Sequence, residues 1–341
     1  MSQALRAVVT GGGGFLGSKI VSMLLAEGCS VRNFSRNEYP ELKARGAVCF
    51  KGDVADGRAV SDAFQNMDVV FHVAAKAGIW GDYSEYYAAN VTGTRNVIEA
   101  CRQNGVAKLV YTSTTSVVFR GYDLRNANED EPLPEKHMAP YLATKAAAEQ
   151  LVIQANCSTL ATVVLRPHLI WGPGDTQIFP RIAERRRANR LMFVGSGDNL
   201  IDCTFIDNAA RAHLDAEKRL KPGSPVAGRA YFISQGDPRP VRDMINALLD
   251  TAGLPPVRRS VPLPVAYVSA WFLEAWYRMF HVASEPAFTR LSVLEMCRDH
   301  YFDISAARRD LGYHPAVSIE EGLDRMRSAF ANNRQMKVGR F

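Results

Sequence analysis

The sequence predicts an α/β fold, in which a doubly wound and mostly parallel sheet carries a smaller, mainly helical C-terminal region. Three observations support this prediction. Short apolar runs alternate with helix-like segments through the first half of the 341 residues, the first run ends at a glycine-rich stretch, and an aromatic segment with helical spacing follows late in the chain. Parallel strands need crossover connections, which are usually helices, so this alternation favours a sheet covered on both faces.

The elements of the N-terminal half follow from the spacing of their apolar residues. A strand is expected over residues 5–10, and a helix over residues 15–26, where apolar residues recur at helical spacing. Further strands are expected at the apolar runs 31–35, 47–51, 68–74, 109–114 and 162–165. No linker or low-complexity run separates two independent modules, so one core with a C-terminal elaboration is the simplest organisation.

Composition and charge favour a folded protein that binds an anionic small molecule. The hydrophobic fraction is 47%, the charged fraction is 22% and the net charge is +6, which are ordinary values for a globular chain. The densest basic group, between Arg181 and Arg190, is more typical of a solvated helix face than of a nucleic-acid-binding surface, so we expect no nucleic acid partner. The mild positive field still favours an anionic cofactor or substrate.

The six cysteines are well separated, with no Cys-x-x-Cys pair and no histidine at metal-ligand spacing. We therefore expect buried thiols in a reducing compartment, and no metal site. No signal-peptide pattern opens the chain, because the first strand runs straight into the glycines. The expected location is the cytoplasm.

The string TGGGGFLG, which follows the first strand, has the spacing of a phosphate-binding loop. Gly11 permits a tight turn, Gly14 lets the backbone approach a pyrophosphate, and Gly17 allows the next helix to pack closely on the sheet. The helix N-terminus, with Phe15 and Leu16 in its first turn, then faces the phosphates. The alternative is a flexible glycine-rich turn, but a strand before it and a helix after it favour a dinucleotide-binding Rossmann core.

The end of the second strand indicates which dinucleotide is bound. An NAD-selective site usually has a carboxylate there, whereas this chain has Ser35 and Arg36, which suit the 2′-phosphate of NADP(H). The alternative is that Arg36 is only a solvated strand-end residue, in which case NAD(H) is the cofactor. Asp53 is the expected partner of the adenine edge. The remaining residues expected around the cofactor are Val54, Ala74 and Lys76.

A Tyr-x-x-x-Lys string supplies the expected catalytic pair. Pro140 precedes it, as is common in the first turn of a helix, and a four-residue spacing puts Tyr141 and Lys145 on one helix face. The Lys145 ammonium would stabilise a phenolate and lower the pKa of Tyr141 from its usual value of about 10, so that Tyr141 acts as general acid or base. Lys145 would also hold the nicotinamide ribose. Thr114 is the expected hydroxyl donor to the substrate oxygen, with Ser113 as the alternative.

Several strings, taken together, resemble the extended short-chain dehydrogenase/reductases over nearly the whole chain. They are Thr10-Gly-x-x-Gly-x-x-Gly17 and Tyr141-x-x-x-Lys145, with residues 72–75, 90–94, 111–114 and 166–174. Residues 202–210 and 311–322 are similar to the 3β-hydroxysteroid dehydrogenase-like branch. Residues 36–42, 74–81 and 231–236 most resemble the bacterial 2-alkyl-3-oxoalkanoate reductases of long-chain olefin biosynthesis.

This resemblance implies NADPH-dependent reduction of the 3-oxo group of a two-tailed β-keto acid, and the reverse oxidation. It also implies that Asn90 supports the active-site helix and that the turn at Pro167 lies beside the nicotinamide. Thr114 stands where many relatives carry serine. The expected organisation is an NADP(H)-binding core with the catalytic residues over 1–170, an interleaved substrate-binding region over 171–332, and a disordered tail over 333–341.

Residues 262–280 form the most aromatic segment and should contact a lipophilic small-molecule substrate. Glu274 and Arg278 share one face of the predicted helix, and the apolar residues opposite them are Val268, Trp271, Phe272, Ala275 and Met279. This amphipathic pattern suits a core or dimer-contact helix, a lid over an acyl-chain pocket, or a helix resting on a membrane surface. We expect a homodimer, with peripheral membrane contact as a further expectation.

A β-keto acid also needs a partner for its carboxylate. His168 or a basic residue within 181–187 is a candidate, although a lone histidine after a strand is more often a structural hydrogen-bonding group. The favoured function is reduction of a hydrophobic 3-oxo acid with NADPH. The alternatives are a 3β-hydroxysteroid or sterol dehydrogenase, a nucleotide-sugar epimerase, and a non-catalytic NADP(H) sensor, which would have no need of Tyr141 and Lys145.

Overall fold

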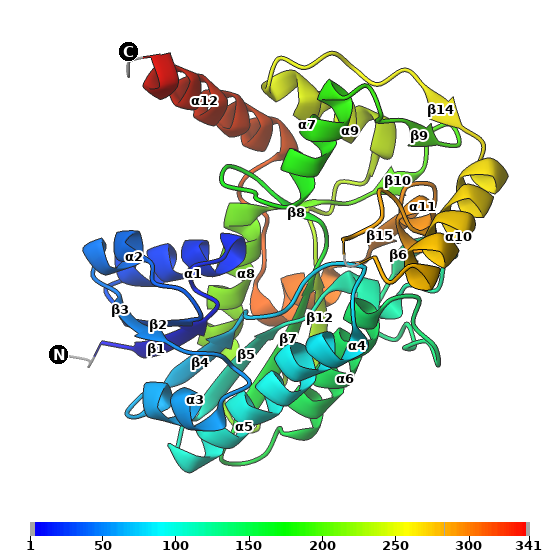
Figure 1. Ribbon diagram of the computed structural model, residues 1–341. Coiled ribbons are helices and arrows are strands. Elements are labelled where there is room, and N and C mark those ends of the chain that lie inside the picture. Colours follow the sequence, from blue (N-terminus) through cyan, green and yellow to red (C-terminus); the bar gives the residue numbers. More distant parts are fainter. Residues whose placement is uncertain (1–3, 283, 339–341) are drawn as a thin grey trace.

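A seven-stranded, entirely parallel sheet forms the central layer, in the order β12-β7-β5-β4-β1-β2-β3 (Figure 1). The computed structural model describes residues 4–282 and 284–338. The strands are β1 (Arg6–Thr10), β2 (Ser30–Ser35), β3 (Val48–Lys51), β4 (Val69–His72), β5 (Lys108–Thr112), β7 (Ala161–Pro167) and β12 (Arg229–Ile233). Each predicted strand is present, which confirms the doubly wound fold. The order reverses between β1 and β4, and ligands of such sheets bind at that point.

Helices cover both faces of this sheet, because its strands place apolar side chains on both. Val8 faces one core cluster, while Ala7 and Val9 face the other. The first cluster is closed by α3 (Gly57–Phe64), α5 (Gly93–Gln103) and α6 (Pro140–Gln154). The second is closed by α1 (Phe15–Ala26) and α8 (Ile206–Arg219), which pack on each other. The short helix α2 (Pro40–Ala44) follows β2.

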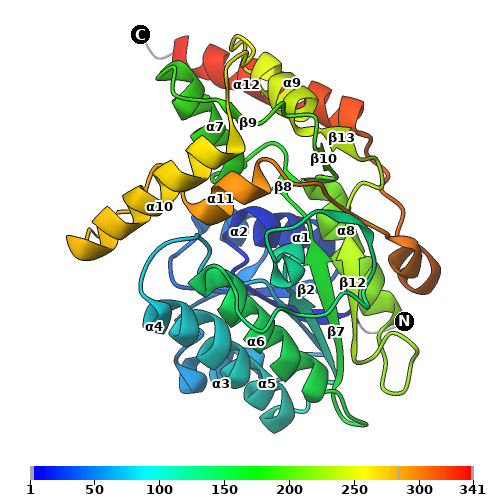
Figure 2. The same cartoon turned by 90° about the vertical axis from the view of Figure 1, so that its right-hand side faces the viewer.

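A second layer lies beyond the carboxyl ends of the strands (Figure 2). Its helices are α7 (Ile178–Arg187), α9 (Val241–Thr251), α10 (Leu263–Met279) and α11 (Arg290–Glu295). A four-stranded sheet joins β13 (Arg239–Pro240), β10 (Leu200–Ile201), β15 (His300–Phe302) and β6 (Leu124–Ala127). Two strand pairs complete it, β8 (Ile170–Trp171) with β11 (Thr204–Phe205), and β9 (Phe193–Val194) with β14 (Ser260–Val261). This layer roofs the end of the sheet where the predicted site residues lie.

Short helical elements fill the connections. They are α4 (Tyr83–Tyr86), the π-helical η1 (Tyr87–Thr92) and η3 (Ala307–Leu311), and the 3₁₀ turn η2 (Thr115–Val118). The last element is the 20-residue helix α12 (Ile319–Val338), which reaches into the tail expected over 333–341, and residues 339–341 lie outside the described part of the chain. None of the helices in the described ranges is both long and apolar enough to span a membrane.

The predicted aromatic helix forms as α10, and its apolar face points away from the core. Trp271, Phe272 and Met279 are 48%, 63% and 71% exposed, whereas Glu274 is 6% exposed. The reason is that Glu274 is bound by Arg290, a residue outside the helix. The Glu274 carboxylate accepts hydrogen bonds from the backbone N and from Nε of Arg290, at 2.7 and 2.9 Å. The charged face is thus the anchored one.

Candidate active site

The glycine loop between β1 and α1 has the shape that the sequence predicts for a phosphate cradle. Gly11 has φ of +70°, which a side chain rarely adopts, and Gly14 is the extended N-cap of α1. A Cβ atom at Gly17 would overlap the carbonyl oxygen of Gly11. Helix α1 therefore approaches the loop with bare backbone, and its unpaired N–H groups favour an anion such as a pyrophosphate. Phe15 and Leu16 form the first turn of the helix.

Two residues that the sequence analysis did not single out support this loop. A Cβ atom at Gly12 would lie 2.6 Å from Oδ1 of Asn33, and one at Gly13 would overlap the ring of Tyr39. Asn33 is buried in β2 and accepts a hydrogen bond from the Ser35 hydroxyl at 2.7 Å. The Ser35 hydroxyl is thus engaged within the protein. Adjacent glycines in a loop often indicate that other side chains pack closely against its backbone. The sequence therefore indicated close packing at Gly12 and Gly13, but not which residues provide it.

Four further predicted cofactor residues lie around the same end of the sheet. Arg36 is exposed just after β2, and Asp53 is exposed after β3, where its Oδ1 accepts a hydrogen bond from the Ala55 amide at 2.9 Å. Val54 is buried against Gly93 at the start of α5. The backbone of Ala74 lies against the glycine loop and donates to the Thr10 hydroxyl at 3.2 Å. The structure therefore brings these residues to the edge where β1, β2, β3 and β4 end.

Asn90 ties the segment after β4 to the active-site helix. Its Oδ1 accepts from the Lys76 amide at 2.8 Å, and its Nδ2 donates to the Lys76 carbonyl at 3.1 Å and to the Thr144 hydroxyl at 3.0 Å. Thr144 directly precedes Lys145 in α6. Asn90 lies in the π-helical turn η1, an irregularity that is frequent at functional sites. The Lys76 side chain pairs with Glu85.

Helix α6 presents Tyr141 and Lys145 to the end of β5. The Lys145 ammonium donates to the carbonyl oxygen of Thr112 at 2.5 Å and lies 4.2 Å from the centre of the Tyr111 ring. Burial lowers the pKa of Lys145 to about 7, against an opposing effect of Glu149. Burial raises the pKa of Tyr141 to about 12, against an opposing hydrogen bond with Thr114. We expected Lys145 to lower the pKa of Tyr141. In the protein without a bound cofactor this expectation is wrong, because burial has the larger effect and raises that pKa.

The two candidate hydroxyl donors have different partners. Ser113 is buried and donates to Oε2 of Glu149 at 2.5 Å. Thr114 is half-buried, accepts from the Ser116 amide at 3.3 Å, and hydrogen-bonds to Tyr141. The structure therefore brings Thr114, and not Ser113, beside the hydroxyl of Tyr141.

A buried ion pair behind Ser113 was missed by the sequence analysis. Glu149 is fully buried, and its Oε1 accepts from Nη2 of Arg166 at 2.5 Å. Because Glu149 lies four residues after Lys145 in α6, helical spacing places the two on one face. From this spacing Glu149 could have been predicted to lie near Lys145. Pro167, which ends β7, follows Arg166 and is also buried.

A directed chain of hydrogen bonds joins the end of β5 to the second layer. His300 Nε2 lies 2.6 Å from the carbonyl oxygen of Glu295, which only accepts, so this nitrogen carries a proton. His300 Nδ1 then accepts from His168 Nε2 at 2.8 Å, and His168 Nδ1 accepts from the Thr115 hydroxyl at 2.6 Å. Burial lowers the pKa of both histidines. Both rings are therefore neutral, and His168 has no nitrogen left for a substrate.

These histidines line a mainly apolar cavity of about 230 Å³ between the sheet end and helices α7, α9 and α11. Among the described residues that line it, Arg185 is the one arginine or lysine and Glu295 the one carboxylate. The Arg185 guanidinium donates to the Ala287 carbonyl. Burial raises the pKa of Glu295 to about 7, and the Glu295 charge contributes to the raised pKa of Tyr141.

The neighbouring arginines of α7 point elsewhere. Arg181 pairs with Glu285 at 2.9 Å, and Arg186 donates to the backbone carbonyl of Pro255 at 2.7 Å. Of the basic cluster that the sequence shows, the structure therefore brings Arg185 into the cavity.

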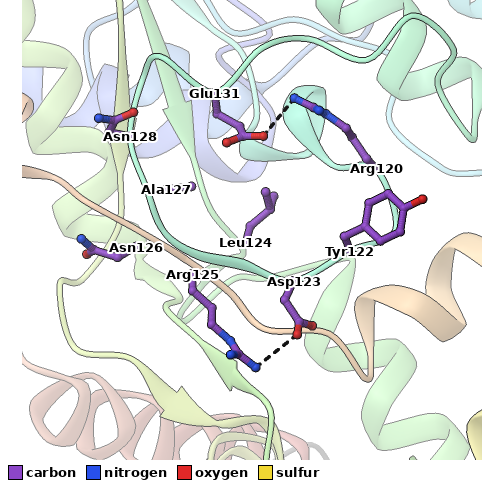
Figure 3. Close-up of a pocket in the computed structure, with 9 residues that line it drawn as sticks. All are labelled: Arg120, Tyr122, Asp123, Leu124, Arg125, Asn126, Ala127, Asn128 and Glu131. Atoms are coloured by element: carbon purple, nitrogen blue, oxygen red, sulfur yellow. Dashed lines mark hydrogen bonds and ion pairs between the residues drawn. The ribbon is translucent and has the colours of Figure 1, made fainter.

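A larger, polar hollow of about 620 Å³ lies along β6, away from the catalytic pair (Figure 3). Its charges are paired with one another, Arg120 with Glu131 at 2.9 Å and Arg125 with Asp123 at 3.2 Å. None of the predicted site residues lines it. His168 and Arg185, which the sequence analysis considered as carboxylate partners, line the smaller apolar cavity, so that cavity is the better candidate for the substrate.

Comparisons with known proteins agree with this arrangement. Residues 8–265 match the 3-beta hydroxysteroid dehydrogenase/isomerase family. The chain is 48% identical to the 2-alkyl-3-oxoalkanoate reductase of Stenotrophomonas maltophilia, over 96% of this chain and 100% of that one. It is 45% identical to the Shewanella oneidensis protein of the same name, with 95% and 86% covered. It is 31% identical to the mouse sterol-4-alpha-carboxylate 3-dehydrogenase, decarboxylating, with 99% and 94% covered.

Solved structures show the same fold. The UDP-glucose 4-epimerase of Thermus thermophilus in complex with NAD has a TM-score of 0.73 at 25% identity, with 96% of this chain and 99% of that chain covered. The UDP-glucose 4-epimerase of Thermotoga maritima has a TM-score of 0.76 at 22% identity, with 97% and 100% covered. The chain belongs to the 3-beta hydroxysteroid dehydrogenase/isomerase family and is an NAD(P)-dependent oxidoreductase of the extended short-chain dehydrogenase/reductase type.

Proposed function

We propose that this protein uses NADPH to reduce the 3-oxo group of a hydrophobic 2-alkyl-3-oxoalkanoic acid, reversibly, in the synthesis of long-chain olefins or related lipids. The observation that carries the proposal is the apolar cavity lined by Glu295, a group whose charge acts on Tyr141. Its lining is mainly apolar, which suits alkyl tails, and it contains Arg185, which suits a carboxylate.

The names of the relatives share one chemical pattern. In a 2-alkyl-3-oxoalkanoate the carbonyl carbon is bonded to the carbon that bears the carboxylate. A sterol-4-carboxylate oxidised at carbon 3 has the same arrangement. Both substrates are therefore 3-oxo or 3-hydroxy acids with a large apolar body. This shared pattern supports an acid as the substrate of this chain.

The residues of α6 and β5 suit reduction of a ketone. Bound NADPH supplies a hydride to carbon 3 of the substrate. The Tyr141 hydroxyl gives its proton to the oxygen, and the Thr114 hydroxyl donates a hydrogen bond where negative charge develops. Because burial raises the pKa of Tyr141 to about 12, the tyrosine is protonated at neutral pH, as a proton donor must be. Lys145 stabilises the resulting phenolate, which regains its proton from solvent.

Reduction also has a chemical consequence for the substrate. A β-keto acid loses CO₂ readily because its carbonyl accepts the electrons of the breaking bond. Conversion of the ketone to an alcohol removes that route, so the 3-hydroxy acid keeps its carboxylate.

The carboxylate partner in this proposal is Arg185. His168, the other candidate from the sequence, uses both ring nitrogens in the hydrogen-bond chain from Thr115 to Glu295. Arg185 donates to a backbone carbonyl, which leaves further guanidinium N–H groups for a ligand.

The preference for NADPH depends on Arg36. The Ser35 hydroxyl is bonded to Asn33, whereas Arg36 is exposed at the end of β2, where an NAD-selective site usually has a carboxylate. Arg36→Asp should lower the ratio of kcat/KM for NADPH to that for NADH by more than about tenfold. An unchanged ratio would refute this part of the proposal.

One comparison tests the substrate. NADPH oxidation is measured with a 2-alkyl-3-oxoalkanoate, and NAD(P)⁺ reduction with a 3β-hydroxysteroid that carries a 4-carboxylate. The second substrate is the alternative that the sterol relatives favour. Turnover of the sterol acid alone would overturn the proposal. The homodimer, the membrane contact and the cytoplasmic location stay predictions.

A further inference from the structure

Helix α10 turns a continuous apolar surface toward solvent. We call this surface the apolar face of α10, and its members are Val265, Val268, Trp271, Phe272, Trp276 and Met279, which are 48% to 71% exposed. At 3.6 residues per turn they fall within an arc of roughly 140° along the whole helix. A row of large exposed side chains on one helix marks an interaction surface rather than scattered surface residues.

The opposite face of the helix is fixed, so the apolar face cannot turn inward. Ala266 and Ala270 are buried against a small apolar cluster that includes Val293 of α11. Glu274 is held by Arg290. Near the end of the helix, the Tyr277 ring packs edge-on against Trp80. Figures 1 and 2 both place α10 at the periphery of the molecule.

The exposed charges on the segment from residue 254 to residue 284 are all positive. Between residues 254 and 284 the one acidic residue is Glu274, which is buried and paired. Arg258 and Arg259 are exposed just before the helix, and Arg278 is exposed at its end. The apolar face thus has cations at both ends, which complement an anionic surface.

These charges disfavour a second copy of the chain as the occupant. In a twofold pair of α10 helices, Arg258 and Arg259 of one copy would lie near Arg278 of the other if the helices ran antiparallel, and each arginine would lie near its own counterpart if they ran parallel. Like charges at such short range oppose association. The helix has 17 residues, about 25 Å in length, and it is fixed along one side. It can lie in the surface of a bilayer without crossing it.

We propose that α10 docks the protein on an anionic lipid bilayer, with its apolar face immersed at the level of the headgroups and Arg258, Arg259 and Arg278 against the lipid phosphates. Trp271 and Trp276 suit this position, because indole rings favour the interface between lipid and water. Helix α10 packs on α11, which supplies Ser292 and Glu295 to the wall of the substrate cavity. The docked surface is therefore one helix away from the proposed site for alkyl chains.

Sedimentation with vesicles tests the proposal without any substrate. The full chain is mixed with vesicles of phosphatidylcholine alone and with vesicles that also contain phosphatidylglycerol. Binding should be at least about tenfold tighter to the anionic vesicles and should weaken with salt. The double variant Trp271→Ser with Phe272→Ser should lose this binding by about tenfold or more. The matched control is Tyr122→Ser, which removes a 71% exposed aromatic residue from a loop outside α10 and should bind like the parent.

Three outcomes would overturn the proposal. The first is absence of vesicle binding by the parent protein at low salt. The second is equal loss of binding in the Tyr122→Ser control. The third is that the double variant turns a dimer into a monomer, by light scattering, and leaves vesicle binding unchanged, which would assign the face to a second copy. Turnover of a short, water-soluble 2-alkyl-3-oxoalkanoate is measured in parallel. Its absence in the parent would refute the proposed function and leave the docking result standing.

Discussion

The two walls of the candidate active site hold charge in different ways. The wall formed by α6, β5 and β7 buries Lys145, Glu149 and Arg166, and the pair between Glu149 and Arg166 is nearly free of solvent. The wall formed by α7, α9, α11 and β15 is mainly apolar, and the two buried histidines that line the cavity, His168 and His300, are neutral. Two ionisable residues of this wall, Arg185 and Glu295, line the cavity. Neither forms an ion pair with another side chain among the described residues.

This difference separates two tasks. Charges that are compensated within the protein hold Ser113 and the backbone of Thr112 at the end of β5, and their removal should harm the fold as well as the reaction. Charges left uncompensated at the cavity are available to a ligand, so their removal should change which substrate is accepted and spare the fold. The five predictions that follow test this division.

The largest effect is expected from Tyr141→Phe. This variant removes the proton donor and keeps the ring, so kcat for the oxo acid should fall by about a thousandfold. Thermal unfolding and the dissociation constant for NADPH should stay close to those of the parent. Undiminished turnover would show that the proton comes from another group. The assignment of catalysis to the wall formed by α6, β5 and β7 would then be wrong.

Glu149→Gln should cost stability. Loss of one partner from a buried pair leaves the Arg166 charge uncompensated, which typically lowers the free energy of unfolding by about 3 kcal/mol. Urea denaturation measures it. The matched control is Asp324→Asn, which breaks an exposed pair with Arg327 and should change stability little. Equal effects of the two variants would contradict the assignment of Glu149 to a compensated, structural wall.

Arg185→Met should change only how well the enzyme discriminates between an acid and its ester. If Arg185 binds the carboxylate, kcat/KM for the acid should fall about tenfold, which is about 1.4 kcal/mol, while kcat/KM for the methyl ester should not change. Arg187→Met is the control, because Arg187 lies on the same helix and is exposed without lining the cavity. An equal loss for acid and ester would assign Arg185 to the shape of the cavity and not to the carboxylate.

The first of these walls was largely predictable from the sequence, because its signals are local. The glycine loop and the pair Tyr141 and Lys145 are defined by spacings of three or four residues, and strand and helix periodicities placed them at one end of a sheet. Even there, the sequence could not separate Thr114 from Ser113. The choice depends on Glu149, which lies 36 residues after Ser113 and reaches it only in the folded chain.

The second wall was not predictable in the same way, because its contacts join distant segments. His168 meets His300 across 132 residues, and nothing near either histidine in the sequence indicates the other. Helix α10 shows the limit most clearly. Its periodicity defines two faces, but the partner that buries Glu274 is Arg290, outside the helix, so the pattern could not tell which face is inward.

The smallest effect is a pH dependence from Glu295. Burial raises its pKa to about 7, so the carboxyl is neutral below that pH and charged above it. A charged Glu295 repels a substrate carboxylate in the same cavity. The value of kcat/KM for the acid should therefore fall, by less than about tenfold, as the pH rises through 7, and Glu295→Gln should remove this component. The titration of Lys145, also near pH 7, is common to both proteins and cancels in their ratio.

The raised pKa of Glu295 also predicts how the free energy of unfolding changes with pH. Its folded-state pKa lies above the unfolded value of about 4.5, so the folded state binds more protons between these two values. The contribution of Glu295 to the free energy of unfolding should be fully present below pH 4.5 and should be lost as the pH rises toward 7. Urea denaturation of the parent and of Glu295→Gln across this range measures the difference. A constant difference would mean that Glu295 is ionised throughout. The wall formed by α7, α9, α11 and β15 would then carry a permanent negative charge, which is incompatible with an anionic substrate held close to Tyr141.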